Sequence, residues 1–214
     1  MTSASPTDGR SARWDEHRLA RRRALVESTV GAIRAHGAGV GMDEVAAAAG
    51  TSKTVVYRHF TDRAGLYAAV ADRVDGTIIR GITRAASGAD GAPPPPREVV
   101  RGVIAAYLHL VEDDPEVYRF IVNAPLLPPG ERPEGDVTAG MTGRIAEHVA
   151  GIVGGVEGPG TVDDATARLW GVALVGMVRA AADAWLADGG RARTADALAD
   201  DLTTLVWDGL RPRG

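Results

Sequence analysis

The sequence predicts an all-α fold, and two observations support that class. Apolar residues recur at every third or fourth position over most of the 214 residues, which is the period of an amphipathic helix. The segments that interrupt this pattern are rich in glycine and proline, as in residues 87–97, which hold four successive prolines. Segments of alternating β-branched residues are few, so we expect helices joined by loops throughout.

Between these breaks the sequence predicts nine helices in two domains. The helices are expected near residues 13–36, 43–49, 53–59, 62–86, 97–112, 115–123, 136–153, 162–187 and 191–210. The polar residues 1–12 are expected to form a flexible arm. The first domain is expected to span residues 13–62, continued by a linking helix to about residue 86, and the second to span residues 63–214.

Composition and missing motifs narrow the classes of function. The chain has no cysteine, which excludes disulfides, zinc-thiolate sites and cysteine nucleophiles. Its five histidines form no metal-spaced pair, and neither a glycine-rich phosphate loop nor a nucleophile elbow is present, so we expect no metal, no cofactor and no enzyme. No apolar run reaches membrane-spanning length and the N-terminus has no apolar signal region, so a cytoplasmic protein without a membrane partner is expected.

Charge is unevenly distributed along the chain. Residues 1–75 hold 11 Lys and Arg against 9 Asp and Glu, whereas residues 76–214 hold 13 against 19, within a net charge of −4. Six arginines lie between Arg10 and Arg23. This pattern indicates that only the N-terminal part meets a polyanion, although a basic arm alone is equally typical of a solvated surface segment.

Two short helices are predicted to meet at Gly50. Acidic Asp43 and Glu44 lie in the first turn of the helix before it, where negative charge suits the helix dipole. Gly50 supplies the left-handed backbone that a tight turn needs, and Ser52 is a good N-cap for the second helix. A helix, a three-residue turn and a second helix form a helix-turn-helix, whose second helix enters the DNA major groove by its N-terminal end.

The second helix divides into an inward and an outward face. Val56 and Phe60 are four residues apart and are expected to pack inward. Lys53 at the N-terminal end suits guanine acceptors, and the methyl groups of Thr54 and Val55 suit the thymine methyl group. The side chains expected to hold phosphates are Tyr57, His59 and Arg63.

Residues 24–70 resemble the DNA-binding domain of the TetR family of transcriptional regulators. The matching positions are Val45-Ala46, Ala49-Gly50-Thr51-Ser52, Val56-Tyr57, His59-Phe60, Arg63 and Leu66. Three residues depart from the family pattern: Thr51 replaces a usual valine, Arg63 a usual lysine, and Gly41 a Thr or Ser that commonly touches phosphate. That phosphate contact is therefore either missing or made by the backbone amide of Met42.

The resemblance strengthens the DNA-binding interpretation of the basic segment, whose arginines would cross the backbone or enter the minor groove. The side chains expected to contact DNA are Arg21, Arg22, Arg23, Met42, Ser52, Lys53, Thr54, Val55, Tyr57, Arg58, His59 and Arg63. The linking helix carries an apolar stripe of Leu66, Val70, Val74 and Ile78, and the resemblance implies that it transmits the ligand signal to the DNA-reading domain.

The resemblance implies a homodimer built on the last two long helices. Residues 170–178 are apolar on nearly every side, so this helix is expected to be covered all round. The expected interface residues are Gly171, Ala173, Gly176, Ala180, Ala184, Leu198, Leu202, Leu205 and Val206. A single-chain helical bundle is the alternative.

An apolar effector pocket is expected in the second domain. Its predicted lining is Tyr107, Tyr118, Phe120, Ile121, Asn123, Trp170, Leu174, Met177 and Arg179, with core packing as the alternative for each residue. Arg179 and Asp183, four apart, are as well placed to pair with each other. Residues 105–121 and 172–186 are similar to the corresponding segments of fatty-acyl-sensing members of the family. The resemblance therefore implies an acyl-CoA or other hydrophobic small molecule as the effector. Together these features predict a dimeric repressor of a palindromic double-stranded DNA operator; a helical adaptor for other proteins is the alternative.

Overall fold

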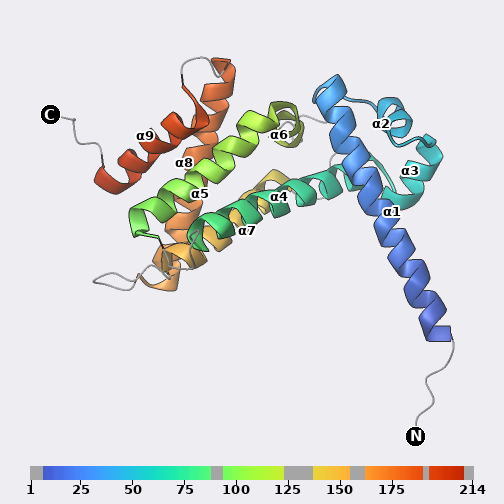
Figure 1. The fold of residues 1–214 in the computed structure, drawn as a ribbon, viewed down its shortest axis with the longest axis horizontal. Helices are drawn as coiled ribbons and strands as arrows, with labels where there is room; N and C mark the ends of the chain where they lie inside the picture. Colours follow the sequence, from blue (N-terminus) through green and yellow to red (C-terminus); the bar gives the residue numbers. More distant parts are fainter. Residues whose placement is uncertain (1–6, 88–93, 123–136, 155–161, 190–192, 210–214) are drawn as a thin grey trace, which may run out of the picture.

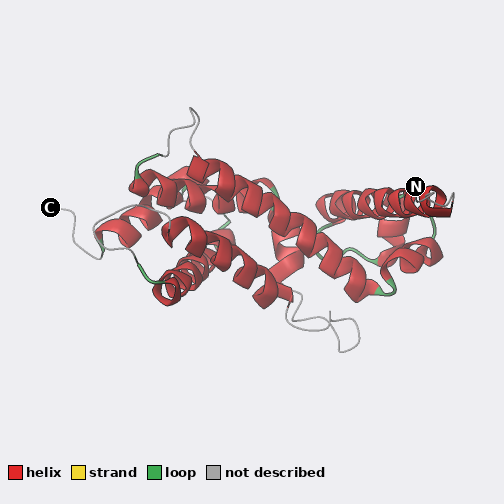
Figure 2. Cartoon of the chain, turned by 90° about the horizontal axis from the view of Figure 1, so that it is seen from below, coloured by secondary structure: helices red, strands yellow, loops and turns green. Residues whose placement is uncertain are grey.

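The computed structural model describes residues 7–87, 94–122, 137–154, 162–189 and 193–209, and all regular structure in these ranges is α-helical (Figures 1 and 2). The helices are α1 (Thr7–His36), α2 (Met42–Ala48), α3 (Lys53–Phe60), α4 (Arg63–Ser87), α5 (Pro96–Asp113), α6 (Pro115–Val122), α7 (Val137–Gly154), α8 (Asp164–Ala187) and α9 (Ala195–Asp208). Within these ranges the predicted all-α class and the nine predicted helices are confirmed.

Two helix starts differ from the prediction by more than two residues. Helix α1 begins at Thr7, so the second half of the segment expected as a flexible arm is helical. Helix α9 begins at Ala195, four residues later than expected, because Thr194 caps it: the Thr194 hydroxyl accepts a hydrogen bond from the Ala197 amide at 3.2 Å.

Helices α1, α2 and α3 and the start of α4 form a small N-terminal unit, called the head below, at one end of the molecule (Figure 1). Its core is made of side chains that are almost fully buried: Leu25, Ile33, Val45, Val56 and Phe60. The predicted inward positions in α3 are thereby confirmed. Burial of these five side chains stabilises three helices that are each too short, or too weakly amphipathic, to hold their place alone.

Helices α5 to α9, with the remainder of α4, form the body. Helix α5 packs between α4 and α9, and α7 packs between α4 and α8. Leu66, Val70, Val74 and Ile78 are all buried, so the predicted apolar stripe of α4 runs continuously from the head into the body. Figure 1 shows α4 as the long helix that joins the two parts.

Helix α6 also joins the body to the head. The Asp114 carboxylate just before it accepts two hydrogen bonds from the Arg34 guanidinium, at 2.5 and 2.6 Å. The Glu116 carboxylate accepts a hydrogen bond from the Ala38 amide at 2.9 Å. At the other end of α6, the buried Tyr67 hydroxyl of α4 donates to the Phe120 carbonyl at 2.6 Å. Displacement of α6 must therefore disturb contacts with both α1 and α4.

Helix α8 is less covered than its sequence suggested. By length and composition it is apolar enough to cross a membrane, which corrects the expectation that no such segment exists, and only 28% of its most apolar window is buried. The expectation that it is covered on every side is wrong for the single chain: Trp170 is 49% exposed, and Leu169 and Val172 are exposed as well. One face of α8 packs on α7, and the opposite face is open.

Candidate nucleic-acid interface

Helix α3 presents a polar ridge on the surface of the head. Lys53, Thr54, Tyr57 and Arg58 are exposed, whereas Val56 and Phe60 of the same helix are buried. The turn before α3 has the expected geometry, since Gly50 adopts a φ of +58°. The local sequence therefore places one face of α3 in the core and leaves four side chains able to reach a ligand outside.

The N-terminal end of α3 is capped differently from the prediction. Ser52 occupies the N-cap position with an extended backbone, but its side chain makes no capping hydrogen bond. Its carbonyl instead accepts from the amides of Val55 and Val56, at 3.0 and 3.2 Å. The exposed Ser52 hydroxyl is not engaged in capping and adds a polar group to the ridge.

Lys53 is exposed but has an acidic neighbour that sequence analysis did not associate with it. Its ammonium group lies 2.7 Å from the Asp43 carboxylate of α2. The hydrogen bond that Lys53 donates to the Asp43 carboxylate raises the pKa of Lys53, so the ammonium form is favoured further at neutral pH. Asp43 therefore competes with any other acceptor for Lys53. Only the packing of α2 on α3 brings these side chains together, because they are ten residues apart.

The structure corrects the role expected for Arg22. Its guanidinium lies over the Phe60 ring, 4.3 Å from the ring centroid, and donates to the His59 carbonyl at 2.5 Å. Arg22 thus attaches α1 to the C-terminal end of α3 and is not directed at a ligand. Its neighbours Arg21 and Arg23 are exposed, as expected of groups that could reach DNA.

Other predicted contact residues are less accessible than the ridge. Arg63, predicted as a phosphate contact, is half-buried and donates to the Val40 carbonyl at 3.4 Å. Val55, His59 and Met42 are also half-buried. Gly41 is the N-cap of α2, and it offers no side chain to replace the Thr or Ser of the family pattern.

A narrow apolar cavity lies within the described core of the body. It lies where α4, α5, α7 and α8 meet and has a volume of about 20 Å³, enough for about one water molecule. Of the predicted pocket residues, Tyr107 and Leu174 line it; the other lining residues are Ile82, Val103, Ile104, Ile145, Val149, Val175 and Val178. Sequence analysis did not single out these aliphatic residues because they are indistinguishable from ordinary core positions.

The remaining predicted pocket residues are dispersed. Trp170 and Met177 line a separate surface hollow of about 410 Å³ between α8 and α9, and Asn123 lies outside the described residues. Phe120 stacks on Tyr67 with ring centroids 4.8 Å apart, and Ile121 is buried in α6. Arg179 is half-buried in α8.

Two tyrosines form a polar cluster beside the apolar cavity. The rings of Tyr107 and Tyr118 pack edge to face, with centroids 6.2 Å apart. The Tyr118 hydroxyl donates to the Asp183 carboxylate at 2.6 Å, so Asp183 has a partner in α6 that its spacing from Arg179 did not predict. Burial raises the pKa of both tyrosines, and both hydroxyls therefore stay protonated. The cluster supplies hydrogen-bonding groups to an otherwise aliphatic region.

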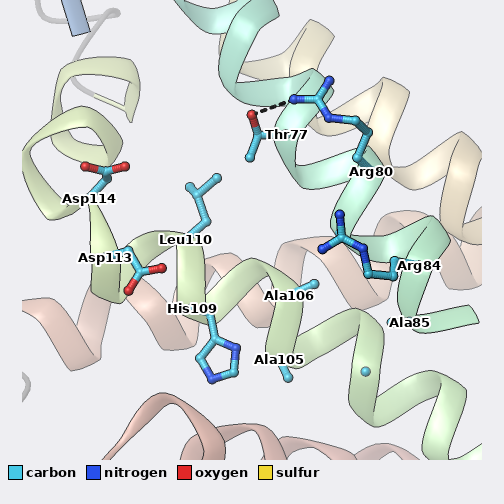
Figure 3. A pocket seen from close by; sticks show the side chains of 12 residues that line it. Thr77, Arg80, Arg84, Ala85, Ala105, Ala106, His109, Leu110, Asp113 and Asp114 are labelled. Carbon is cyan, nitrogen blue, oxygen red and sulfur yellow. Dashed lines mark hydrogen bonds between the residues drawn. The ribbon is translucent and has the colours of Figure 1, made fainter. Parts of the chain in front are cut away.

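A larger open groove of about 690 Å³ lies on the outside of the body between α4 and α5 (Figure 3). Arg80 and Arg84 come from α4, and the Arg80 guanidinium donates to the Thr77 hydroxyl at 3.1 Å. His109 and Asp113 come from the α5 side. Two of its lining residues mark where α4 and α5 pack closely, since a Cβ on Gly102 would lie 2.8 Å from the Ala85 Cβ.

The expected dimer residues fall into two groups. Ala173, Gly176, Ala180 and Ala184 of α8 and Val206 of α9 are exposed, and with Trp170 and Trp207 they make an apolar face, called the α8–α9 face below. Leu198 and Leu205 are half-buried, and Leu202 is buried in the single chain. Gly171 corrects the prediction: it faces α7, where an added Cβ would lie 2.3 Å from the Ala146 carbonyl oxygen.

Comparisons with known proteins identify both halves of the chain. Residues 25–70 match the family described as bacterial regulatory proteins of the tetR family, and residues 83–213 match the tetracyclin repressor-like C-terminal domain. The uncharacterized HTH-type transcriptional regulator Rv0472c of Mycobacterium tuberculosis is 35% identical over 212 residues, which cover 95% of this chain and 83% of that protein.

Two further proteins are similar over different extents. The HTH-type transcriptional activator FasR of Mycolicibacterium smegmatis is 35% identical over 81 residues, 38% of this chain and 35% of that protein. The structure of FadR from Bacillus subtilis in complex with stearoyl-CoA has the same fold, with a TM-score of 0.67 at 15% identity over 88% of this chain and 99% of that one.

These matches also settle the general class of function. Members of the matched family are non-enzymatic, so the expectation that the chain is not an enzyme is confirmed, and the adaptor alternative is set aside. The family assignment is consistent with a cytoplasmic location. With an exposed recognition helix in the head and a matching helical body behind it, the chain belongs to the TetR family of helix-turn-helix DNA-binding transcriptional regulators.

Proposed function

We propose that the protein is a dimeric repressor that binds a palindromic DNA operator and is modulated by a hydrophobic small molecule. The observation that supports operator reading most directly is the exposed ridge of α3, on which Lys53, Thr54, Tyr57 and Arg58 stand opposite the buried Val56 and Phe60. In a helix-turn-helix the first residues of the second helix reach base edges. Lys53 and Thr54 therefore read bases, and Tyr57 and Arg58 hold phosphates.

The α8–α9 face supports the dimer. Trp170 and Trp207 are each about half exposed, and small residues between them let a second helix approach closely. A contiguous apolar surface of this kind is costly in water and is typical of an interface. A second copy of the chain packed on it buries both tryptophans and places two heads on one operator.

The small cavity at the centre of the body supports an effector with a long apolar part. Its lining is aliphatic apart from Tyr107, and the Tyr107–Tyr118–Asp183 cluster beside it can hydrogen-bond a polar head. FadR from Bacillus subtilis, which shares the fold, binds stearoyl-CoA. We propose a fatty acyl-CoA as the effector, and since the cavity is only about 20 Å³, binding must separate α4, α5, α7 and α8.

Such a separation would reach the head through α4 and α6. Both helices contact α1 or continue into the head, so their displacement changes the spacing of the two recognition helices. Weakening operator binding 100-fold requires the effector to favour the non-binding state by roughly 2.7 kcal/mol. This is within the range of a few rearranged hydrogen bonds.

Substitutions on the ridge test the DNA-reading role. A duplex is first selected from random DNA by the wild-type protein. Lys53→Ala is expected to weaken binding to this duplex by about 1–3 kcal/mol, and Tyr57→Phe to weaken it strongly, with unchanged thermal unfolding. Asp43→Asn removes the competitor for Lys53 and is expected to tighten binding. Arg168→Ala, an exposed cation of α8, is the control. Unchanged affinity in both Lys53→Ala and Tyr57→Phe would contradict the assignment.

The effector is tested by native mass spectrometry of the purified protein. The expected spectrum shows a dimer that retains an acyl-bearing ligand or binds added stearoyl-CoA, and the loaded protein releases the selected duplex. A reporter promoter carrying that duplex is expected to be less active when the protein is present. A dimer that never takes up an acyl-CoA would contradict the effector class and leave the DNA-binding result intact.

A further inference from the structure

The part of α1 that precedes Arg22, about four turns, stands outside the packed head. Every described side chain from Arg13 to Ala24 is exposed except the half-buried Arg22, and the first buried residue is Leu25. The helix begins at Thr7, so roughly 27 Å of helix precede the core at 1.5 Å per residue. Figure 1 shows this segment, called the α1 extension below, projecting beyond α2 and α3 and away from the body.

The α1 extension is strongly basic. Between residues 13 and 23 it carries five arginines and two carboxylates, Asp15 and Glu16, a formal balance of +3 within a chain of net charge −4. Arg13, His17 and Arg21 follow one another at intervals of four and therefore lie along one side of the helix, and all three are exposed. Arg18 is paired with Asp15 at 3.1 Å, which leaves the Arg13–Arg21 side free of that carboxylate.

The α1 extension is held in a defined direction relative to the recognition helix. Arg22 packs on Phe60 and donates to the His59 carbonyl, both at the C-terminal end of α3. The helix continues without interruption from this anchor toward Thr7. Arg13 and Arg21 are consequently carried on a helix whose course is set by the position of α3.

An apolar partner is a poor match for this surface. Trp14 is 74% exposed and Leu19 is also exposed, but they are five residues apart and point about 140° away from each other around the helix. A helix that docks on another protein or on a lipid surface needs apolar side chains at intervals of three or four. The extension therefore has no continuous apolar face but a net positive charge, and a polyanion is the favoured partner.

We propose that the α1 extension is a second DNA-binding element, which lies along the phosphate backbone of the duplex flanking each half-site. This inference rests on the proposed operator binding and adds to it: α3 reads the half-site, and Arg13 and Arg21 contact phosphates outside it without reading sequence. The footprint of each head is then longer than the segment that α3 covers.

The test compares two duplexes and two double variants. One duplex is the minimal sequence selected by the wild-type protein, and the other carries ten further base pairs of arbitrary sequence on each side. Arg13→Ala/Arg21→Ala is compared with Arg97→Ala/Arg168→Ala, which removes the same charge from the body. Dissociation constants are measured by fluorescence anisotropy between 50 and 300 mM KCl.

The wild-type protein is expected to bind the longer duplex roughly tenfold more tightly, and the Arg13→Ala/Arg21→Ala variant to lose that advantage. The log–log salt slope of this variant on the longer duplex should be less steep by about 3.6, at 0.9 for each of the four phosphate contacts that the two subunits lose. The control variant should behave as the wild type.

Equal binding of both duplexes by the wild type, or an unchanged salt slope in the Arg13→Ala/Arg21→Ala variant, would overturn the proposal while leaving the role of α3 intact. If Arg13→Ala/Arg21→Ala changed only the oligomeric state of the protein and not its DNA binding, the extension would be a protein contact, and the proposal would be overturned as well. Failure of the wild type to select any duplex would instead overturn the proposed operator binding, and the proposal with it.

Discussion

Glu116 shows how one side chain joins parts of the molecule that are 78 residues apart. One carboxylate oxygen accepts the Ala38 amide of the head at 2.9 Å, and the other accepts from Arg119 within α6. The Ala38 hydrogen bond, supported by Arg119, lowers the pKa of Glu116 below its ordinary value. A carboxylate of depressed pKa stabilises the folded state above its ordinary pKa, and this contribution is lost as the pH falls through the folded-state pKa.

This pH dependence of stability can be tested by removing the charge of Glu116. Glu116→Gln is expected to be less stable than the wild type at pH 7, and the difference should shrink as the pH is lowered below about 4. Urea unfolding at pH 7, 5 and 3.5 measures it. Glu147→Gln, an exposed glutamate of α7, is the matched control. A difference between Glu116→Gln and wild type that is the same at all three pH values would show that charge at this position does not contribute.

At this scale the candidate site was predictable only in part. Exposure of Lys53 and Arg58 follows from the four-residue spacing of Val56 and Phe60, because residues on the opposite side of a short helix must face solvent. The sequence did not predict that Arg22 packs on Phe60, because that contact depends on how α1 crosses α3. The Lys53–Asp43 pair was missed for the same reason.

Among the elements, α7 and α8 pack closely at a glycine in the described part of the body. Gly171 brings α8 against the α7 backbone, since a Cβ there would lie 2.3 Å from the Ala146 carbonyl oxygen and 3.2 Å from the Ala150 amide nitrogen. Neither backbone atom can rotate away as a side chain could. The two helices must therefore separate to accommodate any larger residue.

Gly171→Ala is accordingly expected to lower the free energy of unfolding by about 1–3 kcal/mol. Gly143 of α7 provides the opposite case, since a Cβ there meets nothing within 4 Å. Gly143→Ala should raise the stability by about 0.5–1 kcal/mol, because alanine is the better helix former. The midpoints of urea unfolding of both variants measure these changes in stability. A Gly171→Ala protein as stable as Gly143→Ala would show that α7 and α8 can separate at no cost.

The positions of the helices were more predictable than their ends or the burial of their faces. The apolar stripe of α4 was predictable because every residue with the helical spacing is also buried in the structure. The start of α1 was placed too late, because the residues before Arg13 form helix without any apolar face to mark them. Coverage of α8 was overestimated, because an apolar sequence does not distinguish burial within one chain from burial between two chains.

At the scale of the whole molecule, the α8–α9 face decides whether two heads can act together. Ala173 lies on the open side of α8 and lines the hollow that Trp170 and Trp207 flank. In the proposed dimer the second subunit removes this hollow from water. A carboxylate at position 173 would then be buried among apolar side chains without a partner, which is far more costly than leaving it in solvent.

Ala173→Glu is therefore expected to be monomeric by size-exclusion chromatography with light scattering, while Ala35→Glu, at an exposed site of α1, stays dimeric. Loss of the second head removes the gain from two linked contacts, so binding to the selected palindrome should weaken by a factor of about 100 or more. Binding to a single half-site should be unchanged, because α3 and the head are untouched. A monomeric Ala173→Glu protein with wild-type affinity for the palindrome would show that pairing of heads contributes nothing to operator recognition. A dimeric Ala173→Glu protein would place the interface elsewhere.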